Sequence, residues 1–346
     1  MASLPTISTP VTKLLGIRHP VILAGMNIAA SPELAAAVTN AGGLGVFGGV
    51  FYTPAIFRAK LTELKENLKD KSAPFGVDLL IPQVGGNARK TNYDYTKGEL
   101  PELIDITIEF GAKLFVCAVG VPPKWAVDKL HAAGIPIMNM VGSPNHVPKA
   151  LDAGVDLICA QGGEGGGHTG DVGTSILIPM VVDLCRGRTS PLTGEAVHVV
   201  AAGGIYDGRG LAMALSLGAE AVWVGTRFVA SVESGSPPKH KASVCEAGVH
   251  DTHRTLVYTG RPMRIIKNEY TMNWEENRMQ EMKELLAQGT LPMKRDGKAQ
   301  YPWLCGQVAG AISEVLPARK IVEEMVAGAA EMLRANVAKV TLASRL

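Results

Sequence analysis

The stretch that decides the fold runs from Val155 to Gly170 and reads VDLICAQGGEGGGHTG. Its first part, Val155 to Cys159, is a continuous apolar run, which is typical of a strand buried on both faces. The six glycines that follow let the backbone adopt positive φ angles and approach a ligand closely. Five of them lie between Gln161 and His168, and the sixth is Gly170. A glycine loop at the carboxyl end of a parallel strand is where α/β enzymes bind phosphates and cofactors, so we expect a ligand site here. A flexible surface turn is the alternative.

The same pattern, a helix ending in Ala-Gly or Gly-Ala followed by an apolar strand, recurs along the chain. It occurs at 40–46, 110–116, 133–138, 152–158 and 217–223. A glycine just past a helix ends it through a left-handed cap, and the apolar run after it predicts a buried strand. With three further apolar runs, eight strands are expected at 20–24, 44–47, 74–80, 113–117, 135–139, 155–159, 197–201 and 221–225. Amphipathic stretches of helix length, such as 32–39, 54–68 and 208–217, lie between most of them.

Eight β–α units in succession predict an α/β fold of the (β/α)8 TIM barrel type, with its active site at the carboxyl ends of the strands. An open, doubly wound sheet is the competitor. That fold would place GxGxxG after the first strand, where Ala24-Gly25-Met26-Asn27 stands instead.

The alternation of apolar strands and amphipathic helices ends after the eighth strand, because residues 232–302 are polar and rich in charge. We expect them to form a smaller cap on the substrate side, with Trp274–Gln288 as an exposed helix. Apolar helical periodicity returns at Trp303–Ala311 and Ile321–Val340. The barrel domain is therefore expected to comprise 1–231 and 303–346.

The composition excludes several classes of function. The chain has 346 residues, 47% of them hydrophobic, and a formal net charge of +2, which gives no case for nucleic-acid or membrane binding. Its five cysteines form no CxxC pair, so neither a metal site nor a disulfide framework is expected, and Cys117 and Cys159 are interpreted as packing residues. The final Ser344-Arg345-Leu346 has the form of a peroxisomal address. It predicts a peroxisomal protein in a eukaryote and a cytoplasmic one otherwise.

Glycines and polar residues also follow three other strands. Ala202-Gly203-Gly204 and Gly225-Thr226 follow the seventh and eighth strands, whose loops form the usual phosphate site of barrels. Asp207 is the expected N-cap of the next helix, and Arg227 is expected close to the phosphate or packed beneath it. Ala24-Gly25-Met26 follows the first strand and could lie against a flat ring. Each signal alone is more typical of a tight turn, but together they predict one site with a phosphate end and a ring end.

Over essentially its full length the chain resembles the nitronate monooxygenase (formerly 2-nitropropane dioxygenase) family, in its histidine-containing class. The resemblance is carried by the AGM segment at 24–26, AQGGEGGGHTG at 160–170, the stretch from AAGGI to GTRF at 201–228, and TGRPMR at 259–264. It implies an FMN-containing barrel that oxidises alkyl nitronates with O2 to carbonyl compounds and nitrite. It makes His168 the catalytic residue. It places FMN on Ala24, Gly25, Met26, Asp78, Gln161, Gly167, Ala202, Gly203, Gly204, Gly225 and Thr226.

Two residues depart from the family pattern. Asp78 stands where the family commonly has an asparagine touching the flavin, and a carboxylate there disfavours a reduced, anionic flavin unless it is protonated or paired. Glu164-Gly165 replaces the usual glutamate-alanine, which loosens the loop.

Several alternatives stay open at this point. FMN-dependent enoyl-ACP reductases and NAD(P)H:quinone reductases share the motif set, and a non-catalytic flavin-binding barrel is the alternative of another class. His168 could hold an anionic nitronate as an imidazolium, accept a proton from a neutral nitroalkane, or merely stabilise its loop. Tyr93 and Tyr95 could wall the substrate pocket or be surface residues. His240, His250 and His253 are expected to be solvated, although His240-Lys241 could face the flavin from the cap. Homodimerisation is left open.

Overall fold

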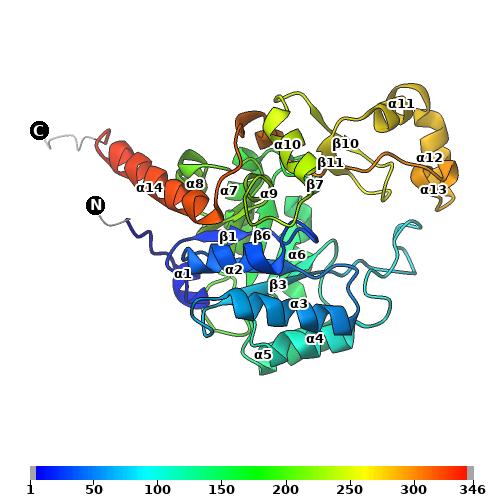
Figure 1. Cartoon of the computed structure of the whole chain (residues 1–346). Helices are drawn as coiled ribbons and strands as arrows, with labels where there is room; N and C mark the ends of the chain where they lie inside the picture. Colours follow the sequence, from blue (N-terminus) through cyan, green and yellow to red (C-terminus); the bar gives the residue numbers. More distant parts are fainter. Residues whose placement is uncertain (1–4, 341–346) are drawn as a thin grey trace, which may run out of the picture.

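The computed structural model describes residues 5–340, and its central feature is a ring of eight parallel strands (Figure 1). These are β1 (Val21–Leu23), β2 (Gly45–Gly48), β3 (Phe75–Leu80), β4 (Leu114–Ala118), β5 (Ile137–Val141), β6 (Leu157–Gln161), β8 (His198–Ala202) and β9 (Ala221–Val224). Each strand pairs with the next along the chain, and β1 pairs with β9. The ring closes between β1 and β2, where the backbone N–H of Leu23 donates to the carbonyl of Leu44 at 2.9 Å. The predicted TIM barrel is confirmed, and the open sheet is wrong.

Helices connect the strands and cover the outside of the barrel. They are α2 (Pro32–Asn40), α3 (Pro54–Asn67), α4 (Leu100–Glu109), α5 (Lys124–Ala132), the 3-10 turn η1 (Pro144–His146), α6 (Val147–Asp152), α7 (Thr174–Cys185) and α8 (Gly208–Ser216). In contrast, α1 (Pro10–Leu15) precedes β1 and packs Val11 and Leu15 against the side chains of the barrel interior. Short polar side chains cap several of their first turns. Asp207 caps α8 as predicted, since its carboxylate accepts from the N–H of Gly210 at 2.9 Å.

Two apolar layers hold the barrel together. One lies between the strands and the outer helices, and it includes Phe57 and Phe115. The other fills the barrel interior with side chains such as Leu114, Cys159 and Trp223. Because the interior is packed with side chains, it is a core rather than a pore, and a ligand site belongs at the rim.

A second, three-stranded sheet lies above the carboxyl end of the barrel. After α9 (Thr226–Val229) and α10 (Pro238–Glu246), the chain forms a hairpin from β10 (Thr252–Thr255) and β11 (Met263–Ile266). The third strand is β7 (Gly167–His168), which belongs to the glycine loop. In Figure 1, α11 (Glu269–Asn277), α12 (Met279–Ala287) and α13 (Pro292–Asp296) extend beyond this hairpin, on the side opposite α14. That 232–302 forms a separate cap stays a proposal.

Three helix predictions need correction. The predicted helix Trp274–Gln288 is two helices, α11 and α12, which meet at the non-helical Arg278. Trp274 is fully buried rather than exposed, because Arg278 lies over its ring and the small cluster around Val257 packs on it. Of Trp303–Ala311, the 3-10 turn η2 spans Gln307–Ala311.

The last helix, α14, spans Ala318–Val337 and packs against α8 and α2, so it begins and ends three residues earlier than expected. No helix within residues 5–340 is long and apolar enough to cross a bilayer. Ser344-Arg345-Leu346 lies outside the described residues.

Candidate functional site

The residues predicted to bind the cofactor lie at one end of the barrel. Parallel strands all point the same way, so their carboxyl ends meet at a single rim. Asp78, Gln161 and Ala202 lie within β3, β6 and β8, whereas the remaining predicted residues of the rim follow β1, β8 and β9: Ala24, Gly25, Met26, Gly203, Gly204, Gly225 and Thr226. The structure therefore brings these residues to the end of the barrel at which catalytic residues of this fold are found.

His168 is held above this rim by the second sheet. Its backbone pairs with Met263 of β11, and Gln161 Nε2 donates to the His168 carbonyl at 2.8 Å. The imidazole Nε2 lies 2.9 Å from the hydroxyl of Thr259, which follows β10. The histidine is thus fixed both by the end of β6 and by the hairpin.

The charge of His168 differs from one sequence expectation. Burial, reinforced by the nearby cation of Arg261, lowers the pKa of His168 to about 4. The side chain is therefore neutral near pH 7. This environment favours an imidazole that can accept a proton over an imidazolium that holds an anion.

Arg261 supplies the positive charge that His168 lacks. Its Nε donates to Asn92 Oδ1 and its Nη1 to the carbonyl of Val119, each at 3.2 Å. Within residues 5–340 it forms no ion pair with a carboxylate. Burial and the neighbouring Arg89 lower its pKa. In the sequence, Thr259 and Arg261 stand in the TGRPMR stretch, which is the signal that points to them.

Backbone strain gathers at the same rim. Asn27, Phe51 and Val119 have positive φ angles of 40°, 67° and 72°, although none of them is glycine. They follow β1, β2 and β4 respectively. Such conformations cost free energy and are found mostly at ligand and active sites, which supports this rim as the functional face.

The glycines of the rim leave room for a phosphorylated ligand. Gly203 and Gly204 have φ angles of +89° and +73°, and a Cβ on Gly204 would meet no atom closer than 3.6 Å. No acceptor for their backbone N–H groups is found among the described residues, so these donors are free for an anion. Arg227 does not face this position. Its Nη2 donates to the carbonyls of Ala230 and Glu314, so it is packed beneath the loop.

Asp78 is a buried acid at the ring end of the rim. Its side chain is 6% exposed, and its Oδ1 has no hydrogen-bond partner within the part of the chain described. Burial raises its pKa to about 8. A Cβ on Gly25 would lie 2.2 Å from Asp78 Oδ2, so the carboxyl group lies directly against the backbone of Gly25.

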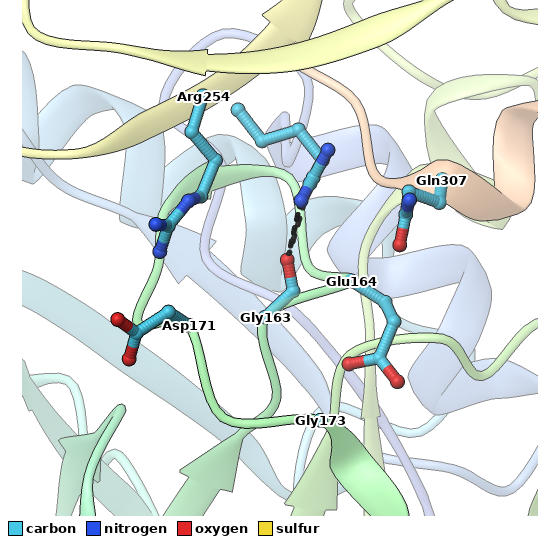
Figure 2. A pocket seen from close by; sticks show the side chains of 7 residues that line it. Gly163, Glu164, Asp171, Gly173, Arg254 and Gln307 are labelled. Carbon is cyan, nitrogen blue, oxygen red and sulfur yellow. Dashed lines mark hydrogen bonds between the residues drawn. The ribbon is translucent and has the colours of Figure 1, made fainter. Parts of the chain in front are cut away.

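A separate cavity of about 370 Å³ lies between the glycine loop and the hairpin (Figure 2). Arg254 and Arg264 line it from the hairpin, Glu164 and Asp171 from the loop, and it contains none of the predicted site residues. Arg264 Nη2 donates to the carbonyl of Gly163 at 2.9 Å, and a dashed line ends at that carbonyl in Figure 2. Glu164 accepts from the N–H and hydroxyl of Thr174. These contacts stabilise the loop that carries His168.

The other histidine, tyrosine and cysteine candidates differ in how far they are buried. His240 is buried and its Nε2 lies 2.9 Å from the carbonyl of Leu304, so the expectation that it is solvated is wrong. His253 is half-buried and bonds Thr271, and His250 is exposed as expected. Tyr95 is buried and its ring lies 4.5 Å from that of the exposed Tyr93. Cys117 and Cys159 are buried free thiols, as interpreted.

A closed parallel barrel with glycine loops and a histidine at its carboxyl rim defines the class of α/β-barrel enzymes that bind their ligand at that end. The chain belongs to the nitronate monooxygenase family, whose model matches residues 8–328. A probable nitronate monooxygenase of Staphylococcus saprophyticus is 33% identical over 305 residues, covering 78% of this chain and 81% of the relative. The crystal structure of a nitroalkane oxidase from Streptomyces ansochromogenes superposes with a TM-score of 0.76 at 25% identity, covering 94% and 99% of the two chains.

A third relative has a different named activity. A hydroxy-methyl-oxo-octahydro-indene-carboxyl-CoA dehydrogenase of Rhodococcus jostii (strain RHA1) is 35% identical over 272 residues, covering 79% of this chain and 69% of the relative. The chain is thus a flavin-dependent oxidoreductase of a family whose members differ in substrate.

Proposed function

We propose that this protein is an FMN-dependent monooxygenase that oxidises small alkyl nitronates with O2, giving a carbonyl compound and nitrite. Membership of the nitronate monooxygenase family and the likeness to a nitroalkane oxidase support the reaction class. The observation that carries the proposal is the pair formed at the rim by a neutral His168 and the cation of Arg261. A proton acceptor beside a fixed positive charge suits a substrate that is either a weak carbon acid or its anion.

The residues at the rim fit FMN. Gly203 and Gly204 offer free backbone N–H groups for the phosphate, together with Gly225 and Thr226. Ala24, Gly25 and Met26 would hold the ring on the side of Asp78, with Gln161, Gly167 and Ala202 completing the site. When bound, FMN supplies an acceptor for electrons from the substrate and passes them to O2.

His168 and Arg261 would share the work on the substrate. The Thr259 hydroxyl lies 3.3 Å from the Arg261 carbonyl, and when it donates there it accepts from His168 Nε2–H. His168 Nδ1 then keeps a free lone pair, which removes the proton from the α-carbon of a neutral nitroalkane. The planar guanidinium of Arg261 binds the two oxygens of the nitro or nitronate group. A preformed nitronate needs only this second interaction.

Anaerobic mixing of the FMN-loaded protein with each candidate reductant tests the proposal. Bleaching of the flavin by a nitronate is the expected result, followed by release of nitrite when O2 is admitted. Bleaching by NADH or NADPH alone contradicts it and favours a reductase, the alternative to which the CoA-linked relative adds weight. A protein that stays colourless after reconstitution with FMN would instead be a non-catalytic barrel.

A further inference from the structure

Asp78 is a buried acid, and no cation accompanies it within residues 5–340. No charged side chain contributes to the rise in its pKa, which comes from burial. The titratable groups near it are the thiols of Cys117 on β4 and Cys159 on β6, and burial together with the charge of Asp78 raises the pKa of both. Both thiols are therefore neutral. The strand β2 presents Gly48 opposite Asp78, and the loop after β1 presents Gly25.

The surroundings of Asp78 are mostly backbone. A Cβ on Gly48 would lie 2.4 Å from the N–H nitrogen of Asn27, and one on Gly25 would overlap the Asp78 carboxyl group. This part of the rim therefore has no space for further side chains. Asp78 contributes the polar group there, and its Oδ1 finds no partner within residues 5–340. A buried polar atom without a partner is costly, so an unpaired one beside a ligand site indicates a ligand that pairs with it.

We propose that Asp78 is a neutral carboxylic acid at physiological pH and donates a hydrogen bond to the ring of bound FMN, a role that it loses on ionisation. This inference rests on the proposed FMN function. A protonated carboxyl group donates a hydrogen bond through its O–H and carries a proton that can leave. With a pKa of about 8, roughly nine-tenths of the acid is protonated at pH 7 and nine-tenths ionised at pH 9.

Ionisation of Asp78 has a direct consequence for reduction. Above pH 8 a carboxylate faces the ring, so two-electron reduction of the flavin also draws one proton from water onto Asp78. The midpoint potential of the wild type therefore falls more steeply with pH above 8 than that of Asp78→Asn, by one proton per two electrons. Dithionite titration of both holoproteins between pH 6 and 9.5 measures this. If the midpoint potentials of the two proteins fall equally steeply with pH above 8, the proposal is wrong.

The apoprotein gives a second test that does not depend on FMN. Because the pKa of Asp78 is higher in the folded than in the unfolded protein, its protonated form stabilises the folded state. This contribution is complete below the unfolded pKa of about 4 and is lost as the pH rises to about 8. In thermal melts, the Tm of Asp78→Asn relative to that of the wild type should rise from pH 5 to 8. Above pH 8 the difference between the two Tm values should stay constant. The ratio of the two unfolding constants should change about tenfold per pH unit. Asp128→Asn, an exposed acid on α5, is the control and should give a constant difference.

The outcomes separate the two proposals. In one outcome neither protein binds FMN, but the difference in stability between the two apoproteins grows with pH as stated. The proposed FMN function is then wrong, and so is the hydrogen bond to the flavin, although Asp78 is a neutral acid. If both proteins bind FMN and the apoprotein difference is constant, Asp78 is an ordinary acid and the inference is wrong. Should Asp78→Asn not fold, the wild-type apoprotein decides. The infrared carbonyl band of a protonated carboxyl must then be present at pH 7, fall to about half near pH 8 and be largely lost at about pH 9.

Discussion

The pH dependence of activity on a neutral nitroalkane tests the environment of His168. With its pKa lowered to about 4, the imidazole is about 1% protonated at pH 6 and less at pH 8. An ordinary histidine, with a pKa near 6.5, would be about 76% protonated at pH 6 and about 3% at pH 8, so its rate as a base would rise about fourfold. We therefore expect kcat/KM to be constant between pH 6 and 8 and to fall only as the pH approaches 4.

The variant His168→Asn completes this test. Asparagine keeps a polar side chain in the loop but cannot accept the proton, so activity on a neutral nitroalkane should fall by about 10²–10⁴-fold. Activity on a preformed nitronate should fall less, because that substrate has already lost its proton. Nitrite release from freshly diluted nitroethane and from its nitronate measures both, with the flavin spectrum as the control for cofactor retention.

Two results would refute this reasoning. A fourfold rise in the wild-type rate between pH 6 and 8 would mean that His168 is not shielded as the structure shows. Equal, small losses on both substrates in His168→Asn would make the histidine a structural residue of the loop.

Three further predictions concern other parts of the molecule. Arg261→Gln should raise KM for a nitronate by about 10–100-fold, corresponding to the 1.5–3 kcal/mol of a hydrogen bond to a charged group, with a smaller fall in kcat; an unchanged KM in steady-state kinetics would remove Arg261 from the site. Gly203→Ala should lower Tm more than Gly111→Ala, because both glycines have positive φ but only at Gly203 would the Cβ lie 2.8 Å from a carbonyl oxygen, that of Gly162. Equal thermal shifts would contradict this. Asp156→Ala should destabilise the protein by about 3–5 kcal/mol in urea unfolding, because this buried carboxylate accepts from Ile137 N–H and the Ser190 hydroxyl and pairs with His131 at the opposite end of the barrel. A loss below about 1 kcal/mol would show that these contacts add little.

The barrel could be predicted from the sequence because its strands carry a strong local signal. Parallel strands are covered on both sides, so each reads as a continuous apolar run, and the glycine after each helix marks where the next strand begins. The ends of β3, β6 and β8 were predicted to within two residues for this reason. The rim residues followed from the strand ends.

The rest of the site depended on contacts between distant segments. The two-residue strand β7 is too short to show a period, so nothing local indicated that His168 pairs with Met263. The neutral state of His168 likewise comes from its burial and from Arg261, far along the chain. Trp274 was misjudged because an amphipathic pattern does not say what covers its apolar face.

The shared sheet has a consequence for engineering. Residues 167–168 bond to β11, and Thr169 N–H bonds to the carbonyl of Pro262, so the loop and the hairpin are joined by backbone. Exchanging 252–266 for the hairpin of a relative would therefore also shift His168, the proposed general base. A designer who wishes to change substrate choice without losing turnover should transplant 160–173 and 252–266 as one cassette.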